Sequence, residues 1–326
     1  MPRVTLPQAI PARSRVRPAL TIAVLGACAL LSEASAADSV RLRYGFKPQA
    51  SYEQALGLNL TMTFDPASVP APLLALLQSM TGEIKQEVSS KARLQTKTRN
   101  ADGTLPFEYR ILEAKGTLTQ GGQTRAIPSL DKAAEKPPSQ GHVTADGRQA
   151  ILDAGDSATE GIPKRVRERV ADSLPVLPDK DLRPGDTFET KTTMTLPGPS
   201  GKGERQVQAV WLYTLKTLTR KEATFDVKQT LPEAASMTVG QGQKLEMAGG
   251  GTGSAIFDLS NGTFRTIQVD LDLTMTADIP LPPGLTMNSD GSSGTGTQGG
   301  TPGGAPAPTR IRVLVKGPMT MTLGPA

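Results

Sequence analysis

Apolar and polar residues alternate with a period of two along much of the chain. The clearest run covers residues 52–64, where the even positions are mostly apolar and the odd positions mostly polar. The apolar positions of this run include Leu56, Leu58, Leu60 and Met62. A second run, residues 267–279, places Leu271, Leu273 and Met275 on one face in the same way. Because successive side chains of a strand point to opposite faces, each run predicts a strand with one apolar and one solvated face, which is typical of antiparallel sheet.

Other stretches with a similar pattern predict further strands. We expect them at residues 40–46, 83–98, 105–119, 143–153, 187–196, 206–218, 223–231, 254–259 and 310–323. Asn, Asp and Gly residues at 100–103, 145–147 and 260–262 are suited to the turns between them. A run of about thirteen residues at about 3.3 Å each reaches roughly 43 Å, whereas most strands have about five or six residues. Such long strands favour a large curved sheet.

Two stretches have the spacing of helices instead. Residues 70–80 are rich in Leu, and residues 159–174 place Ile162, Val166 and Val170 four apart on one stripe. Lys and Arg residues surround that stripe, so this helix would present a basic face either to water or to anionic lipid headgroups. Farther along, residues 282–309 contain eight Gly and hardly an apolar side chain, which predicts a flexible Gly/Pro linker.

An internal repeat indicates how these elements are organised. Apart from two turn positions, residues 46–53 match residues 182–189 by residue class, and each copy leads into a strand that contains Thr-Met-Thr. A duplication would explain the match. We therefore expect a first β repeat at 37–157, a helical connector at 158–178, a second β repeat at 179–281, the linker at 282–309 and a closing strand at 310–326. The predicted fold is all-β with helical insertions, in which two related antiparallel meanders form a large curved sheet or half-barrel.

The stretch 207–215 differs from the other predicted strands because both of its faces are apolar. Trp211 and Tyr213 lie on one face, and Val210 and Leu212 lie on the other. This pattern predicts a strand that is buried on both sides at the centre of the fold. Trp211 then either packs in the core or lines a cavity.

The N-terminus has the three zones of an export signal. Four Arg residues precede an apolar run at 19–31, and Ala34-Ser35-Ala36 offers a small-x-small cleavage site. Residues 1–36 are therefore predicted to be a signal peptide, and the mature protein to be periplasmic or secreted. Residues 25–28, Leu-Gly-Ala-Cys, resemble a bacterial lipobox, so acylation of Cys28 and a lipid anchor are the alternative.

Removal of the signal changes the composition of the protein. The whole chain has 36 Lys and Arg against 31 Asp and Glu, and the first 36 residues hold four Arg and one Glu, so 32 basic and 30 acidic residues remain. The near-neutral mature chain has no electrostatic footprint for nucleic acid. Cys28 is the only cysteine, so cleavage after Ala36 leaves a fold without disulfides.

Residues suited to catalysis or metal binding are scarce. His142 is the only histidine, in a loop-like stretch before a predicted strand, and no Ser stands in a Gly-x-Ser-x-Gly nucleophile motif. Ser129-Leu130-Asp131-Lys132 matches Ser-x-x-Lys without its companion motif, and Gly249–Gly253 reads as a loop or bulge before the strand 254–259. Asp270 and Asp272 fit ordinary solvated positions of a strand. We expect no metal, no cofactor and no enzymatic activity, with a hydrolase as the remote alternative.

The export signal, the long one-sided strands over residues 40–280 and the apolar helices that could cover a concave face resemble the periplasmic lipoprotein-carrier group in pattern. They also resemble other exported bacterial β-rich proteins of unknown function. The first resemblance implies that a concave face binds an apolar ligand such as a lipid acyl chain. The candidates for lining that face are Leu56, Leu58, Leu60, Met62, Trp211, Leu271, Leu273 and Met275.

Two alternatives to lipid binding remain open. The same apolar side chains could pack against one another as a closed core, in which case the protein could be an envelope scaffold or an interaction module for a protein or a glycan. A membrane-spanning barrel would also show alternating strands, but it needs girdles of aromatic residues. One Trp, four Tyr and seven Phe are few for that, so we expect no membrane span after processing.

Overall fold

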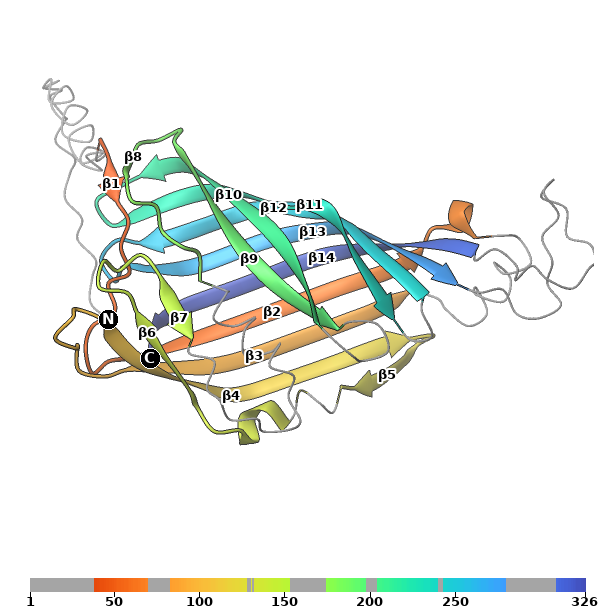
Figure 1. The fold of residues 1–326 in the computed structure, drawn as a ribbon, viewed down its shortest axis with the longest axis horizontal. Coiled ribbons are helices and arrows are strands. Elements are labelled where there is room, and N and C mark those ends of the chain that lie inside the picture. Colours follow the sequence, from red (N-terminus) through yellow and green to blue (C-terminus); the bar gives the residue numbers. More distant parts are fainter. Residues whose placement is uncertain are drawn as a thin grey trace, which may run out of the picture. The chain divides into compact units, whose positions relative to one another are not determined.

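A computed structural model describes residues 38–69, 83–127, 130, 132–152, 174–197, 204–239, 243–279 and 309–326. Almost all regular structure in these residues is β-strand (Figure 1). The strands form one large antiparallel sheet of 12 strands and a separate two-stranded pair, and the large sheet does not close into a barrel. The predicted fold class, an all-β protein built on a large curved antiparallel sheet, is confirmed.

Nine of the described strands are unusually long, with 11 to 18 residues, as the alternation predicts. Their bounds are β1 (Val40–Arg41), β2 (Ser51–Phe64), β3 (Ile84–Thr96), β4 (Leu105–Gln120), β5 (Gln123–Ala126), β6 (Ser139–Val143), β7 (Ala150–Leu152), β8 (Asp181–Leu182), β9 (Thr187–Pro197), β10 (Glu204–Leu218), β11 (Glu222–Val239), β12 (Gln243–Asp258), β13 (Thr263–Ile279) and β14 (Thr309–Pro325). Two short 3₁₀ helices are η1 (Pro66–Ser68) and η2 (Lys132–Glu135). Within the described residues, no helix has the length and apolar character that a membrane crossing requires.

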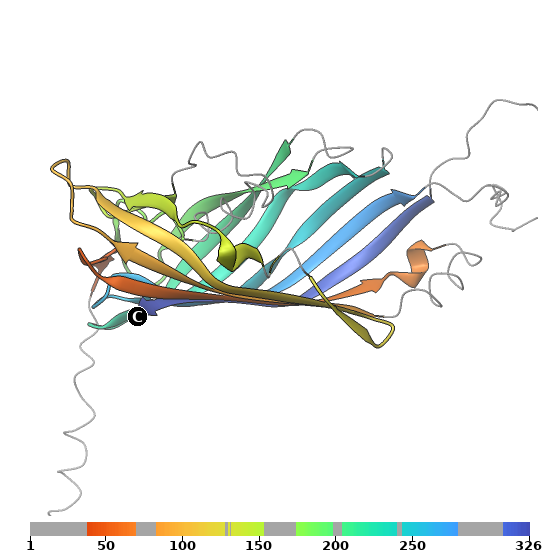
Figure 2. The same cartoon turned by 90° about the horizontal axis from the view of Figure 1, so that it is seen from below.

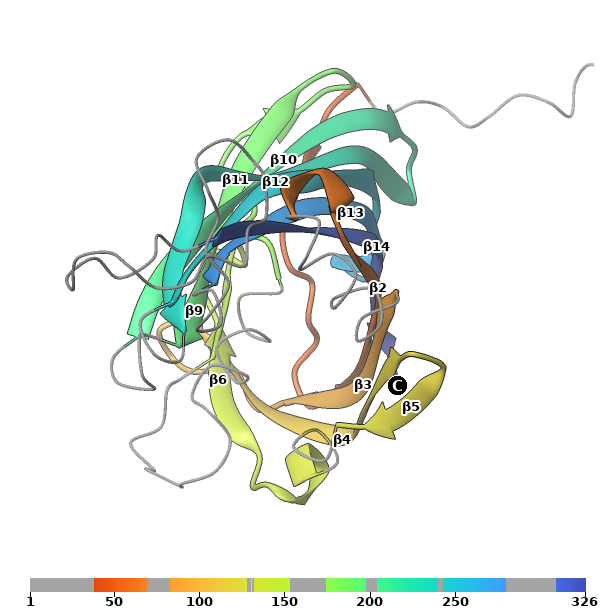
Figure 3. The same ribbon diagram turned by 90° about the vertical axis from the view of Figure 1, so that its right-hand side faces the viewer.

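The sheet consists of two meanders that are joined by β14. Strands β2, β3 and β4 form the first meander, and β9 to β13 form the second. Strand β14 pairs with β13 on one side and with β2 on the other (Figure 1). The predicted closing strand therefore lies in the middle of the sheet. Viewed along the strands, the sheet curls from the edge strand β9 round to β6 (Figure 3), beyond which β7 forms the other edge, and the two edges do not pair with each other.

The two segments paired by the repeat hypothesis make the same kind of turn. Position 49 corresponds to position 185, and Gln49 (φ 55°) and Gly185 (φ 94°) both have a positive φ. Each turn leads into the first strand of a meander, β2 or β9, and the strands β1 and β8 that precede them pair with each other. The duplication itself stays a prediction.

Several predicted boundaries are wrong, and pairing partners explain why. The predicted strand 40–46 is regular only in β1, because the residues that follow leave the small β1–β8 pair and cover the large sheet. The predicted strand 143–153 is interrupted: Val143 ends β6, residues 144–149 turn, and Ala150–Leu152 form β7, which pairs back with β6. His142 lies in β6 and not in a loop. Strand β10 is not central: it lies beside the edge strand β9, and Leu212 on its outer face is 36% exposed.

The glycine run 249–253, which the sequence predicts to be a loop or bulge, lies inside β12, and the register with β11 shifts at its first residue, Gly249 (φ 116°). Partners on both sides, β11 and β13, supply the hydrogen bonds that hold these residues extended. A Cβ atom at Gly253 would meet the carbonyl oxygen of Gln268 and would lie 2.7 Å from Cα of Val269. Glycine is therefore required by the close approach of neighbouring backbones, in keeping with the role of glycine where a sheet bends sharply.

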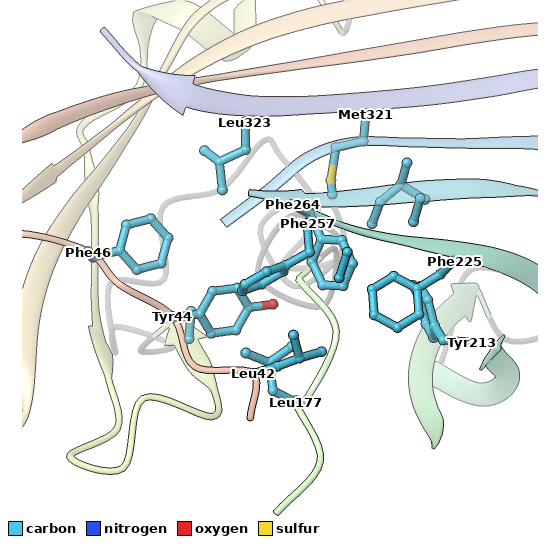
Figure 4. Packing of buried hydrophobic residues seen from close by; sticks show 14 of the residues in the cluster. Leu42, Tyr44, Phe46, Leu177, Tyr213, Phe225, Phe257, Phe264, Met321 and Leu323 are labelled. Carbon is cyan, nitrogen blue, oxygen red and sulfur yellow. The ribbon is translucent and has the colours of Figure 1, made fainter. Parts of the chain in front are cut away.

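The packed core lies at one end of the sheet, on its concave face (Figure 4). Aromatic side chains dominate it: Phe257 and Phe264 meet edge to face with ring centroids 5.0 Å apart, and Phe188 stacks on Tyr213 at 4.8 Å. The chain from β1 to β2 crosses the concave side there and buries Leu42, Tyr44 and Phe46 against the sheet (Figures 3 and 4). Leu177, from the segment before β8, closes the cluster.

Several predictions lie outside the described residues. They are the signal peptide and Cys28, both predicted helices (70–80 and 159–174, apart from Leu174 at its end), and the linker up to residue 308.

Candidate functional site

The apolar face of the sheet continues beyond the packed core. Cross-strand register places Leu56, Met321 and Ile267 in one row, and Met62, Val315 and Leu273 in another. Directly paired residues of antiparallel strands project to the same side. The predicted lining residues of β2 and β13 therefore share the concave face, and the inward side chains of β14 lie between them. Trp211, on β10, projects to the same face beside Tyr213 of the core.

Burial changes along this face. At the core end, the inward side chains are almost completely buried. Toward the other end, the inward side chains of β2 and β13 are only half-buried, and this group includes Leu58, Leu60, Met62, Leu271, Leu273 and Met275. On β14, between these two strands, Ile311 and Val315 stay buried. The opposite faces of these strands carry polar residues, and Figure 2 shows the curved sheet from a second direction. The face thus passes from a closed core into a partly exposed apolar surface.

The chemical character of the face changes together with its burial. Phe and Tyr fill the core end, whereas aliphatic side chains and methionines line the rest. Met62, Met247, Met275 and Met319 are half-buried there. Methionine is flexible and polarisable, and it is used on surfaces that adapt to ligands of varied shape. The exposed part of the face is suited to contact with hydrocarbon chains.

A cavity of about 100 Å³ lies where the core meets this surface. On one side it is lined by Thr190, Thr192, Trp211 and Tyr213 from β9 and β10. On the other side it is lined by Leu56, Ile267, Met319 and Met321 from β2, β13 and β14, and Pro175 contributes from the segment before β8. Two of the predicted lining residues, Leu56 and Trp211, therefore meet at one cavity, although they come from the two different meanders.

Hydrogen bonds hold the polar side of the cavity in place. The indole Nε1–H of Trp211 donates to Thr192 Oγ1 at 2.9 Å, and the backbone N–H of Val176 donates to Thr190 Oγ1 at 3.2 Å. Tyr44 donates its hydroxyl to the carbonyl of Pro175 at 2.7 Å. Burial raises the pKa of the Tyr44 and Tyr213 hydroxyls well above their usual value, so both phenols stay neutral.

The described residues offer no arrangement for metal binding. No group of three or more His, Cys, Asp or Glu residues comes together in this part of the chain. Asp270 and Asp272 are exposed on the outer face, and Asp272 pairs with Lys316 at 3.1 Å. Ser129 and Asp131 of the Ser-x-x-Lys motif lie outside the described residues.

Comparisons with known proteins give a structural similarity but no sequence match. No protein-family model matches the chain, and no curated protein matches it. A search of solved structures found lipovitellin, in a structure of lipid–protein interactions in lipovitellin, with a TM-score of 0.42 and 9% sequence identity. The match covers 86% of this chain and 25% of the lipovitellin chain, so this chain spans about a quarter of the length of that one.

Sequence reasoning found part of this site and missed part of it. Alternation in β2 and β13 identified the apolar face correctly. Met319 and Met321 were assigned only to a closing strand, although the same alternation in β14 could have placed them beside the other two strands. The sequence does not predict that the cavity is also lined by Thr190, Thr192 and Pro175, because the curvature of the sheet brings these residues to it.

Proposed function

We propose that this protein is an exported, non-catalytic protein that binds lipid hydrocarbon on the concave face of its sheet. One observation carries the proposal: the apolar face continues past a packed aromatic core into half-buried Leu and Met side chains, with a cavity at the junction. Burial of hydrocarbon is worth about 0.8 kcal/mol per CH₂ group. A chain laid along β13, β14 and β2 would complete the burial of these side chains.

A pair of variants on adjacent residues tests the proposal. Leu58→Asn places a polar group on the concave face, whereas Asn59→Asp changes the exposed outer face of the same strand. After incubation with a total lipid extract, native mass spectrometry should show lipid bound to the wild type and to Asn59→Asp. We expect at least a fivefold loss of bound lipid in Leu58→Asn, since one buried Leu contributes about 1.5–3 kcal/mol.

Circular dichroism and thermal unfolding establish whether both variants are folded. If Leu58→Asn fails to fold, Leu58→Ala replaces it, with a smaller expected loss of lipid. The proposed function would be contradicted if the wild-type protein carried no lipid and its melting temperature did not rise on addition of lipid.

The proposed location outside the cytoplasm is supported by the N-terminal sequence. Mass spectrometry of the mature N-terminus distinguishes a soluble exported protein from a lipid-anchored one. A free Ala37 corresponds to cleavage after Ala36 and a soluble exported protein. An acylated Cys28 corresponds to a protein anchored to the membrane by lipid.

A second candidate function, an interaction module of the cell envelope, is favoured by strand β9. This strand ends the hydrogen-bonded order of the sheet, so one edge of it is available to pair with a strand of another protein. A crosslinking pull-down from envelope extract tests this function. Loss of a captured partner after Lys191→Pro, which blocks pairing along the edge, would support it.

A further inference from the structure

The cavity between the core and the open apolar surface has an uncharged wall. The described residues that line it are Leu, Ile, Met, Pro, Trp, Tyr and Thr, none of which is ionised at neutral pH. The hydroxyl oxygens of the two threonines already accept hydrogen bonds, Thr190 from the N–H of Val176 and Thr192 from the indole of Trp211. An ionised carboxylate or phosphate would lose its hydration there without gaining a cationic partner, and this is strongly unfavourable. The cavity is therefore suited to hydrocarbon.

The cavity lies where the open surface ends. Leu56, Met321 and Ile267 form one row across β2, β14 and β13, and all three line the cavity. On one side of this row, the inward side chains of β2 are the half-buried Leu and Met residues of the surface. On the other side, the next inward pair, Gln54 and Leu323, is buried in the packed end of the sheet. A hydrocarbon chain on the surface can thus place one end in the cavity but cannot continue past it.

The dimensions of the cavity and of the surface fit a single acyl chain. An apolar cavity of about 150 Å³ holds a benzene molecule, so the volume of about 100 Å³ found here suits about four carbons of a chain. From Leu56, at the cavity, to Met62 the strand extends by about 20 Å. Each leaflet of a bilayer supplies about 15 Å of the hydrocarbon core. An acyl chain of that length with its end in the cavity would cover the Leu residues of β2 and leave its head group near Met62.

From the uncharged wall, the position at the end of the surface and these dimensions, we propose that the cavity binds the methyl end of a fatty acyl chain, so that the protein takes up lipids tail first. This inference rests on the lipid-binding function proposed above. The end of the chain, and not the head group, then determines which lipids fit. A chain with a carboxylate at both ends is excluded, because its second carboxylate would have to enter the uncharged cavity.

Brominated ligands test this orientation in the wild-type protein. Trp211 is the only tryptophan and lines the cavity, and bromine quenches tryptophan fluorescence on contact. The bromine of ω-bromohexadecanoate is apolar and close to a methyl group in size, so this ligand should quench Trp211. We expect α-bromohexadecanoate to bind without quenching, and unsubstituted hexadecanoate gives the effect of binding itself. A lysophosphatidylcholine with the ω-bromo chain distinguishes the source of the chain: quenching by it extends the site to esterified chains, and quenching by the acid alone restricts the site to free fatty acids.

Affinities give an independent measurement. Hexadecanedioate should bind at least tenfold more weakly than hexadecanoate. Each CH₂ group that is kept out of the cavity lowers the affinity about fourfold. Leu56→Phe narrows the cavity and should therefore weaken hexadecanoate binding at least tenfold and abolish quenching by ω-bromohexadecanoate. Thr322→Phe adds the same ring to the exposed outer face of β14, beside Met321, and should change neither.

The possible outcomes separate this inference from the proposed function. Equal quenching by the α-bromo and ω-bromo ligands, or equal binding of hexadecanedioate and hexadecanoate, would overturn the inference while leaving lipid binding intact. If the protein binds lipid from a total extract but not hexadecanoate, the inference alone fails. If it binds neither, the proposed function fails as well. The comparison of brominated ligands uses only the wild type, so it decides the orientation even if Leu56→Phe does not fold.

Discussion

Gly253 illustrates how a single residue permits the close approach of neighbouring strands in this sheet. It lies in the interior of β12, paired with Val227 of β11 and Val269 of β13. The backbone of β13 comes so close that a methyl group at position 253 would meet the Gln268 carbonyl. Gly57, in β2, has the same strand environment but open space around its Cα.

The two glycines provide a matched test at the scale of the residue. Gly253→Ala should lower the free energy of unfolding by about 1–3 kcal/mol, because the central strands must shift to admit the methyl group. Gly57→Ala should leave it unchanged or raise it by up to about 1 kcal/mol, through the reduced freedom of the unfolded chain. Urea denaturation measures both. Equal effects of the two substitutions would show that the close approach at Gly253 is unimportant.

Gln229 and Trp211 show what can be inferred at the scale of the residue from sequence alone. The pattern 207–215 indicated that Trp211 either packs in the core or lines a cavity, and the structure places it at a cavity. The sequence does not single out Gln229 as a buried residue whose side-chain oxygen has no hydrogen-bond partner, because a lone Gln in an alternating strand is ordinary. Its direct neighbour on β12 is Gly251, which has no side chain, and only the register of β11 and β12 reveals this pairing.

At the scale of elements, the segments that cover the core are tied together by one carboxylate. Asp179 lies just before β8 and pairs with Arg41 of β1 at 2.7 Å, with Arg43 at 2.7 Å and with Arg148 of the β6–β7 turn at 3.7 Å. Hydrogen bonds from Arg41 and Arg43 lower the pKa of Asp179. The ionised carboxylate therefore stabilises the folded state.

This arrangement predicts a pH dependence. Because the pKa of Asp179 is lower in the folded protein than in the unfolded chain, its stabilisation is fully present above the ordinary Asp pKa of about 4 and is lost as pH falls below it. Asp179→Asn should lower the melting temperature slightly at neutral pH, and the difference from wild type should disappear in acid. Asp226→Asn, which breaks one exposed pair with Lys216, is the control and should have no measurable effect. A pH-independent difference for Asp179→Asn would contradict this account.

Elements were predictable where the sequence pattern itself decides the structure. The positions of β2 and β13 follow from strict alternation, and the turns at 100–103 and 260–262 follow from Asn, Asp and Gly. The extended conformation of residues 250–253 could not be predicted, because the neighbouring strands β11 and β13 impose it against the preference of glycine. The irregular conformation of residues 42–50 could not be predicted either, because their apolar residues alternate as in a strand. In the structure these apolar side chains pack across the concave face of the sheet.

At the scale of the whole molecule, β14 determines whether the two meanders form one sheet. It pairs with β13 and β2, and it buries Ile311, Val315, Met321 and Leu323. Four such side chains contribute about 6–12 kcal/mol, a sum comparable with the net stability of a typical domain. The two meanders share no other strand pairing within the described sheet.

Removal of β14 should therefore abolish the native fold. We expect a chain that ends before Thr309 to lose its cooperative thermal transition and to be cleaved rapidly by protease, because β2 and β13 lose their shared partner. A chain that lacks only Gly324–Ala326 is the control and should keep its transition. Retention of a cooperative transition in the longer truncation would show that the meanders are stable on their own.

The central place of β14 also has a consequence for the timing of folding. Every other strand of the sheet is synthesised before β14, so β2 and β13 each emerge with an unpaired edge and must wait for it. The nascent chain cannot reach its native state while β14 is still in the ribosome. In a precursor with the export signal proposed here, that delay would keep the polypeptide unfolded enough to be threaded through a translocation channel, and folding would finish on the far side of the membrane.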